Sequence, residues 1–202
     1  MKTILRSTLA VAAIAVAASL TAPVSVVAGE MTTKSNAETK PPFSGPANVA
    51  YAAEVWAQLK AAHLVGADSL ISHPYFGTPP HGGVLEYYET SMTVDGHRGV
   101  MMVKKNYKGE PGDDDAMAAV LGDRAANLLS ITVMFQREKG YDADHQDWFW
   151  AKYLPDGSLD KNPKGMQLAG RVAKGADAGC IACHTGAPGE DYIFTHDKMT
   201  KK

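Results

Sequence analysis

Apolar and polar residues alternate along several short stretches in the middle of the chain. The clearest case is 129–137, where Leu129, Ile131, Val133 and Phe135 fall on one side and mostly polar residues on the other. A period of two is typical of a β-strand with one buried face. Runs rich in Val, Tyr, Met or aromatic residues predict three more strands, at 84–90, 99–107 and 148–154.

Two stretches have a helical rather than an alternating pattern. Residues 47–64 are rich in alanine and place Val49 and Trp56 on one stripe, which predicts an amphipathic helix. The run Asp113-Asp114-Asp115 would stabilise the start of a shorter helix at 116–126. A solvated loop is an equally good interpretation of these three acids.

The order of these elements indicates a fold class. Asp95-Gly96 lies between the first two strands, and this dipeptide is common in the turns of β-hairpins. Strands joined by hairpins, with helices before and between them, favour an α+β fold. We therefore predict a largely antiparallel β-sheet with flanking helices.

The N-terminus has the pattern of a secretory signal. Lys2 and Arg6 precede an apolar run from Leu9 to Leu20, and small residues lead up to Ala28. The apolar run is short for a membrane span, which needs about 20 apolar residues. We therefore predict a signal peptide at 1–28 and a periplasmic mature protein with no membrane segment; an uncleaved anchor is the alternative.

The rest of the chain divides into two parts. Residues 29–46 are rich in Thr, Lys, Glu and Pro and predict a flexible leader, whereas 47–202 would form a single domain. The whole chain has 20 Lys and Arg against 22 Asp and Glu, a net charge of −2. Removing 1–28 takes away Lys2 and Arg6 and no acid. The mature chain is then more acidic and has no basic stripe, so we expect no nucleic-acid partner.

The most specific motif is Cys180-Ile181-Ala182-Cys183-His184, which has the C-x-x-C-H spacing of a covalent haem attachment site. Each thiol can add to one vinyl group of the porphyrin, and the histidine can coordinate the iron. A redox-active C-x-x-C pair or half of a zinc site would use the same residues, but neither has its usual sequence context here. We therefore predict one covalently attached haem c, with His184 as the iron ligand.

The position of the motif excludes some haem folds. Only a short segment follows His184, so no methionine well downstream can serve as a second axial ligand in the manner of the class I cytochromes c. A four-helix cytochrome c′ carries its motif late, but it needs four long helices. The strand-like runs of this chain do not supply them.

The chain resembles the cytochrome P-460 family in a series of segments that occur in the same order. The C-terminal haem motif is one of them. The others are His81-Gly82, Val103-Lys104-Lys105-Asn106-Tyr107, Val133-Met134-Phe135, Gly140-Tyr141-Asp142, Asp147-Trp148-Phe149-Trp150-Ala151-Lys152-Tyr153, Pro155-Asp156-Gly157 and Asp191-Tyr192-Ile193-Phe194-Thr195.

The resemblance implies a periplasmic mono-haem protein, built on an antiparallel sheet and expected to be a homodimer. In the P-460 enzymes a lysine is bonded to the haem, and the iron binds and oxidises hydroxylamine to nitric oxide or nitrous oxide. The sister cytochromes c′-β lack this bond and bind nitric oxide. The resemblance also implies that the iron position opposite His184 is open or holds a small molecule.

The cross-linking lysine would be Lys104, which matches the Val-Lys position of the family. Members usually have Glu after this lysine, whereas this chain has Lys105, so both lysines are candidates. Strand alternation puts them on opposite faces. Hydroxylamine chemistry also favours a nearby carboxylate base, for which Glu86, Glu89 and Glu138 are the candidates. We interpret His81 as part of a turn.

Three functions are consistent with the sequence. The first is a haem oxidoreductase that oxidises hydroxylamine, with Cys180 and Cys183 as anchors, His184 as iron ligand, Lys104 as haem modifier, and a small periplasmic redox protein as electron acceptor. The second is a nitric-oxide-binding protein without turnover. The third is an electron-transfer cytochrome, which would need a second axial ligand.

Overall fold

The computed structural model describes residues 42–196. The predicted signal peptide and most of the predicted leader lie outside these residues. The described chain forms a six-stranded antiparallel sheet in which the strands follow their sequence order. The strands are β1 (Tyr75–Phe76), β2 (Val84–Val94), β3 (His97–Tyr107), β4 (Leu128–Gln136), β5 (Trp148–Tyr153) and β6 (Ala169–Gly170).

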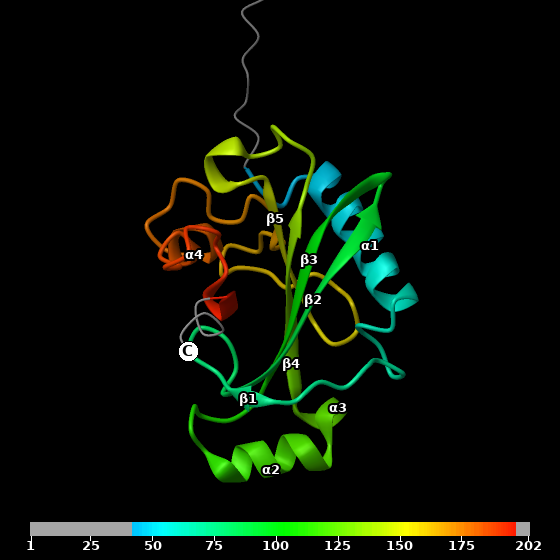
Figure 1. Ribbon diagram of the computed structural model, residues 1–202, viewed down its shortest axis with the longest axis vertical. Helices are drawn as coiled ribbons and strands as arrows, with labels where there is room; N and C mark the ends of the chain where they lie inside the picture. The colour runs from blue at the N-terminus through cyan, green and yellow to red at the C-terminus, as the bar shows by residue number, and fades with distance from the viewer. Residues whose placement is uncertain (1–41, 197–202) are drawn as a thin grey trace, which may run out of the picture. The chain divides into compact units, whose positions relative to one another are not determined.

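Helices lie on both faces and at one end of this sheet (Figure 1). They are α1 (Pro46–Ala61), α2 (Asp114–Gly122), α3 (Arg124–Asn127), α4 (Cys180–His184) and the 3-10 turn η1 (Ala143–His145). In Figure 1, α1 covers one face, and α4 lies on the other with the C-terminal residues. The predicted α+β class is confirmed.

The longest strands form the hairpin β2–β3. Its register runs from Val84 opposite Tyr107 to Val94 opposite His97. The predicted turn at Asp95-Gly96 joins them, and both residues have positive φ angles of 48° and 77°. A two-residue turn of this kind matches the twist of the two strands. The hairpin fixes which side chains of β3 face each side of the sheet.

The two faces of the sheet have separate cores. One face packs against α1 through side chains such as Val103, Val133 and Phe149. The Tyr153 hydroxyl on this face donates to the Ala52 carbonyl of α1 at 2.8 Å. The other face presents Met102, Met134, Trp148 and Trp150 to Ile181, Tyr192 and Ile193 of the C-terminal region.

The four predicted strands are all present, with β2 longer than expected. The predicted helix at 47–64 corresponds to α1. Only the predicted helix at 116–126 is divided, because Asp123 ends α2 in an extended conformation and then caps α3 through the Ala126 N–H. Asp113 accepts a hydrogen bond from the Asp115 N–H at 2.9 Å, so the acidic run does begin a helix.

Residues 42–46, the last part of the predicted leader, contact the sheet. Ser44 N donates to the Ala169 carbonyl, and Phe43 forms a bridge with Gly170 of β6. These residues at the end of the predicted leader thus lie along the edge of the sheet. Within 42–196, no helix has the length and apolar character needed to cross a membrane.

Candidate functional site

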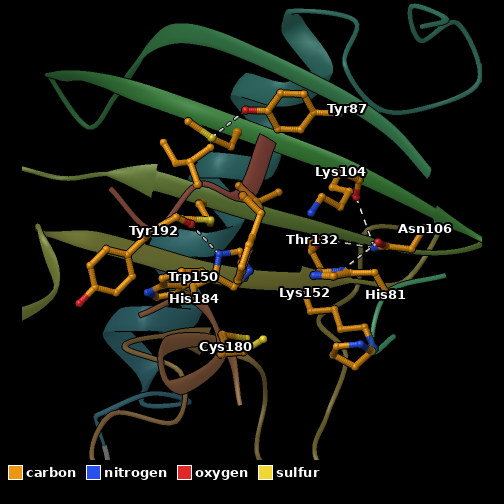
Figure 2. Close-up of a pocket in the computed structure, with 18 of the residues that line it drawn as sticks. His81, Tyr87, Lys104, Asn106, Thr132, Trp150, Lys152, Cys180, His184 and Tyr192 are labelled. Carbon is orange, nitrogen blue, oxygen red and sulfur yellow. Dashed lines mark hydrogen bonds between the residues drawn. The ribbon is translucent and has the colours of Figure 1, made fainter. Parts of the chain in front are cut away.

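An apolar cavity of about 270 Å³ lies on the face of the sheet opposite α1. The sheet contributes Met102, Lys104, Thr132 and Trp150 to its wall, and the C-terminal region contributes Cys180, Cys183, His184 and Tyr192. Figure 2 shows Lys104, Thr132 and Trp150 from the strands and Cys180 and His184 from α4 around the same site. A second cavity of about 230 Å³ shares Lys104, His81 and His184 with the first.

The helix α4 carries the whole C-x-x-C-H motif. It begins after Gly179, which has a φ of 124°. A Cβ atom at this position would lie 2.4 Å from the Cβ of Ala173, so no other residue fits here without rearrangement. A single turn of helix brings both cysteines and His184 to the wall of the same cavity.

The ring of His184 is held in a defined orientation. Its Nδ1 lies 2.7 Å from the Tyr192 carbonyl oxygen. A carbonyl can only accept a hydrogen bond, so Nδ1 carries the proton and Nε2 keeps its lone pair. Metal-binding histidines are commonly oriented by such a bond to a backbone carbonyl. Burial lowers the pKa of His184, which favours the neutral form that a metal requires.

The carbonyl that orients His184 comes from an unusual backbone conformation. Tyr192 has a φ of 69°, in the left-handed region that residues with side chains seldom adopt. Its ring packs near Trp150. The centroids of the Trp150 indole and the His184 imidazole are 4.9 Å apart. Local strain of this kind is often found where a side chain must be positioned for function.

The two cysteines do not have the properties of a redox-active pair. Both are free thiols in the structure. Burial raises the pKa of Cys180 to about 11, whereas reactive C-x-x-C pairs have a lowered pKa. Within 42–196, no three His, Cys, Asp or Glu side chains come together as they would around a metal ion. The alternatives of a redox pair or a zinc site therefore gain no support.

The two adjacent lysines point to opposite sides of the sheet. Lys104 lines both cavities, together with His184 and Cys183. Lys105 is buried on the other face, where its Nζ donates to Ser69 Oγ and to the Leu70 carbonyl, each at 2.9 Å. Of the two candidates, only Lys104 lies where it could reach a bound haem.

Lys105 belongs to a buried polar cluster on its own face. Glu86 is fully buried and accepts hydrogen bonds from Arg124 Nε and from the Tyr107 hydroxyl, each at 2.8 Å. Lys105 Nζ lies 3.8 Å from the same carboxylate. Burial lowers the pKa of Lys105. This cluster is separated from the cavity by the sheet.

None of the three acids considered as a base lines the cavity. Glu86 belongs to the buried cluster, and Glu138 pairs with Arg137 in the loop after β4. Glu89 lies on the cavity face, where it accepts from the Tyr87 hydroxyl at 2.8 Å and contacts His196 Nε2 at 2.9 Å. The expectation of a carboxylate at the site therefore has no counterpart in the cavity wall.

His81 does belong to a turn, because its backbone N–H donates to the Thr78 carbonyl at 3.1 Å, and its side chain also lines both cavities. Burial, with contributions from Lys104 and His184, lowers its pKa to about 4. The adjacent prolines and glycines hid this role in the sequence, because they are typical of turns. The sequence also did not reveal Asn106, whose Oδ1 lies 3.1 Å from His81 Nδ1, or the Tyr192 carbonyl that orients His184, although both residues belong to segments that resemble the family.

The cavity fits a haem in several respects. Its wall is mostly apolar and holds both thiols of the motif and an imidazole with a free Nε2 lone pair. The indole N–H of Trp150 in this wall is buried without a hydrogen-bond partner among the described residues. Buried polar groups are normally satisfied, so an orphaned donor here is consistent with a polar group of a bound molecule. Cys180, Cys183 and His184 are the residues that would hold the haem.

The antiparallel sheet thus carries an apolar cavity with an oriented imidazole in its wall, which is consistent with a haem-binding α+β protein. A family model described as cytochrome P460 matches residues 85–195, more than half of the 202-residue chain. The chain therefore belongs to the cytochrome P460 family, and this membership implies a haem cofactor with iron. No curated protein and no solved structure gives a significant match.

Proposed function

We propose that this protein is a c-type haem oxidoreductase that oxidises hydroxylamine. The observation that supports this most is the presence of Lys104 in the same cavity wall as Cys180, Cys183 and His184. The three motif residues would hold one haem, and Lys104 would modify it. The haem iron would supply the position where hydroxylamine binds and would accept its electrons.

The residues of the cavity have distinct roles in this proposal. Cys180 and Cys183 tether the porphyrin through thioether bonds. His184 would coordinate the iron through Nε2, while its Nδ1–H donates a hydrogen bond to the Tyr192 carbonyl oxygen and keeps the ring from turning. Met102, Met134 and Trp150 form an apolar wall that limits the access of water.

The presence of Lys104 in the cavity wall supports its proposed role as the haem-bonded lysine. A lysine must lose its proton to act as a nucleophile. Lys104 extends from the middle of β3, with Tyr87 opposite on β2 and Thr132 opposite on β4. The strand therefore holds the Lys104 Cα on the face of the sheet that carries the cavity.

Oxidation of hydroxylamine to nitric oxide or nitrous oxide releases electrons and protons in equal number, and the electrons need an acceptor. We propose a small periplasmic redox protein as this acceptor and a homodimer as the working form. The secretory pattern of 1–28 supports the location, and the family resemblance supports the dimer. Sedimentation of the haem-loaded protein would test the dimer.

Mass spectrometry of a proteolytic digest tests the proposal directly. A haem joined to both the Cys180–His184 peptide and the Lys104 peptide is expected in the wild type. Lys104→Leu should lose the second link and the oxidation of hydroxylamine. Lys105→Leu is the matched control, because this residue lies on the other face, and it should keep the link. A haem bound only through the motif cysteines in the wild type would overturn the proposed enzyme.

A further inference from the structure

A second histidine faces the cavity from the side opposite α4. His81 lies in the loop 77–83 before β2, whereas His184 comes from the C-terminal helix. Both line the two cavities, and Figure 2 shows both side chains in the site. The loop is closed by a hydrogen bond from Gly77 N to the Gly83 carbonyl at 2.8 Å. His81 is therefore attached to a fixed part of the structure.

The loop also packs tightly against the end of β3. A Cβ atom at Gly82 would lie 2.1 Å from the Tyr107 carbonyl oxygen, and one at Gly77 would lie 1.9 Å from the Gly82 carbonyl oxygen. Such close approaches are possible only for glycine. They hold the backbone next to His81 against the strand that carries Lys104 and Asn106.

Asn106 sets the orientation of the His81 ring. This side chain is buried, and its Nδ2 lies 3.2 Å from the Ser130 carbonyl oxygen and 3.3 Å from the Lys104 carbonyl oxygen. Carbonyls only accept, so the amide nitrogen must face them and Oδ1 must face His81. The distance from His81 Nδ1 to Asn106 Oδ1 is 3.1 Å. His81 Nδ1 is thus the donor, and its Nε2 has a lone pair.

His81 and His184 therefore have matching arrangements. In each, an acceptor oxygen fixes the proton on Nδ1 and leaves Nε2 able to bind a metal. Their ring centroids are 6.3 Å apart, and the ring planes are nearly perpendicular at 86°. Nitrogen–metal bonds of about 2 Å put two imidazoles on one metal with centroids about 6 Å apart. If a substrate also lay between the metal and one of the imidazoles, the centroids would be farther apart than this.

We propose that His81 is the second axial ligand of the haem iron in the resting protein, opposite His184. An incoming small molecule then has to displace His81 before it can bind. This inference rests on the haem attachment proposed above, and it does not depend on hydroxylamine being the substrate. It differs from the open iron position that the family resemblance implies.

Spectroscopy of the holoprotein tests the assignment. Without added ligand, the wild type should give the absorption and electron paramagnetic resonance spectra of a low-spin, six-coordinate ferric haem. His81→Ala should become high-spin, and added imidazole should restore the low-spin form. His63→Ala is the matched control, because that side chain is exposed and pairs with Asp68. It should leave the spectra unchanged.

The affinity for an added ligand gives a second readout. Bound His81 makes the competent state a minor one, which weakens the apparent affinity in proportion to its population. Imidazole should therefore bind His81→Ala at least tenfold more tightly than the wild type. Covalent haem content, measured after denaturation, shows whether each variant has assembled.

The outcomes separate this inference from the proposed function. A high-spin, five-coordinate wild type overturns ligation by His81, as does a His81→Ala variant that stays low-spin without imidazole. If the wild type is high-spin and still oxidises hydroxylamine, the proposed function stands and the second ligand does not. If the wild type is low-spin through His81 but does not oxidise hydroxylamine, the second ligand stands and the proposed function does not.

Discussion

At the scale of the residue, Lys104 and Lys105 show how one position along a strand changes the environment of a side chain. Their Cα atoms are neighbours on β3, yet Lys104 meets the cavity and Lys105 meets the buried carboxylate of Glu86. The alternation of a strand predicts the opposite faces. It does not predict which face holds the site, because both faces of β3 are apolar enough to be buried.

This contrast gives a prediction about stability. Lys105→Met should lower the free energy of unfolding by roughly 2–4 kcal/mol, because it removes one cation from a buried carboxylate. Lys60→Met should lower it by much less, since that side chain is exposed on α1. Denaturant titration of the two haem-loaded variants measures the difference. Equal losses would mean that the cluster around Glu86 does not stabilise the fold.

His196 gives a prediction about pH. Its ring nitrogens contact Glu89 Oε2 at 2.9 Å and Asp191 Oδ2 at 2.7 Å, and these carboxylates raise its pKa. A raised pKa in the folded state means that protonated His196 stabilises the fold below about pH 6.5, its unfolded value. This stabilisation is lost as the pH rises through the folded pKa.

Amide hydrogen exchange in residues 191–196 should therefore be faster at pH 9 than at pH 6, after correction for the intrinsic rate. His196→Gln should remove most of this pH dependence. An unchanged dependence in the variant would assign it to another group.

At the scale of the element, the β3–β4 pair depends on Gly99. A Cβ atom at this position would lie 1.9 Å from the Gln136 carbonyl oxygen of β4. Gly99→Ala should therefore separate the strands locally and lower the free energy of unfolding by about 2 kcal/mol or more. Gly122→Ala is the control, because an added Cβ there meets nothing within 4 Å. Thermal unfolding of both variants measures the effect, and a neutral Gly99→Ala would contradict the close packing.

The elements also show what the sequence could predict. β2 to β5 and α1 have enough residues for their period to be visible, and all five were predicted. β1 and β6 have two residues each and exist only because a neighbouring strand pairs with them. The site shows the same difference between local patterns and contacts of distant segments. The motif of Cys180, Cys183 and His184 is local, whereas the orientation of His81 by Asn106 joins residues that are distant in sequence.

At the scale of the whole molecule, the cavity gives a prediction about haem removal. A Cys180→Ala/Cys183→Ala double variant, purified without haem, should unfold at a temperature at least about 10 °C lower than the loaded wild type. The reason is that the haem-free variant has an unfilled cavity of about 270 Å³, which lowers the free energy of unfolding by several kcal/mol. Calorimetry measures the shift. Equal midpoints would mean that the sheet and α1 stabilise the fold without help from the haem.

The chain order of this molecule has a consequence for its biogenesis. The last strand, β6, ends at Gly170, and both thiols and the His184 imidazole follow it in α4. A ribosome releases the N-terminal part of a chain first. Every strand described within 42–196 has therefore been synthesised before the residues proposed to attach the haem emerge. A prematurely terminated chain could then form the whole sheet and still be unable to bind haem covalently.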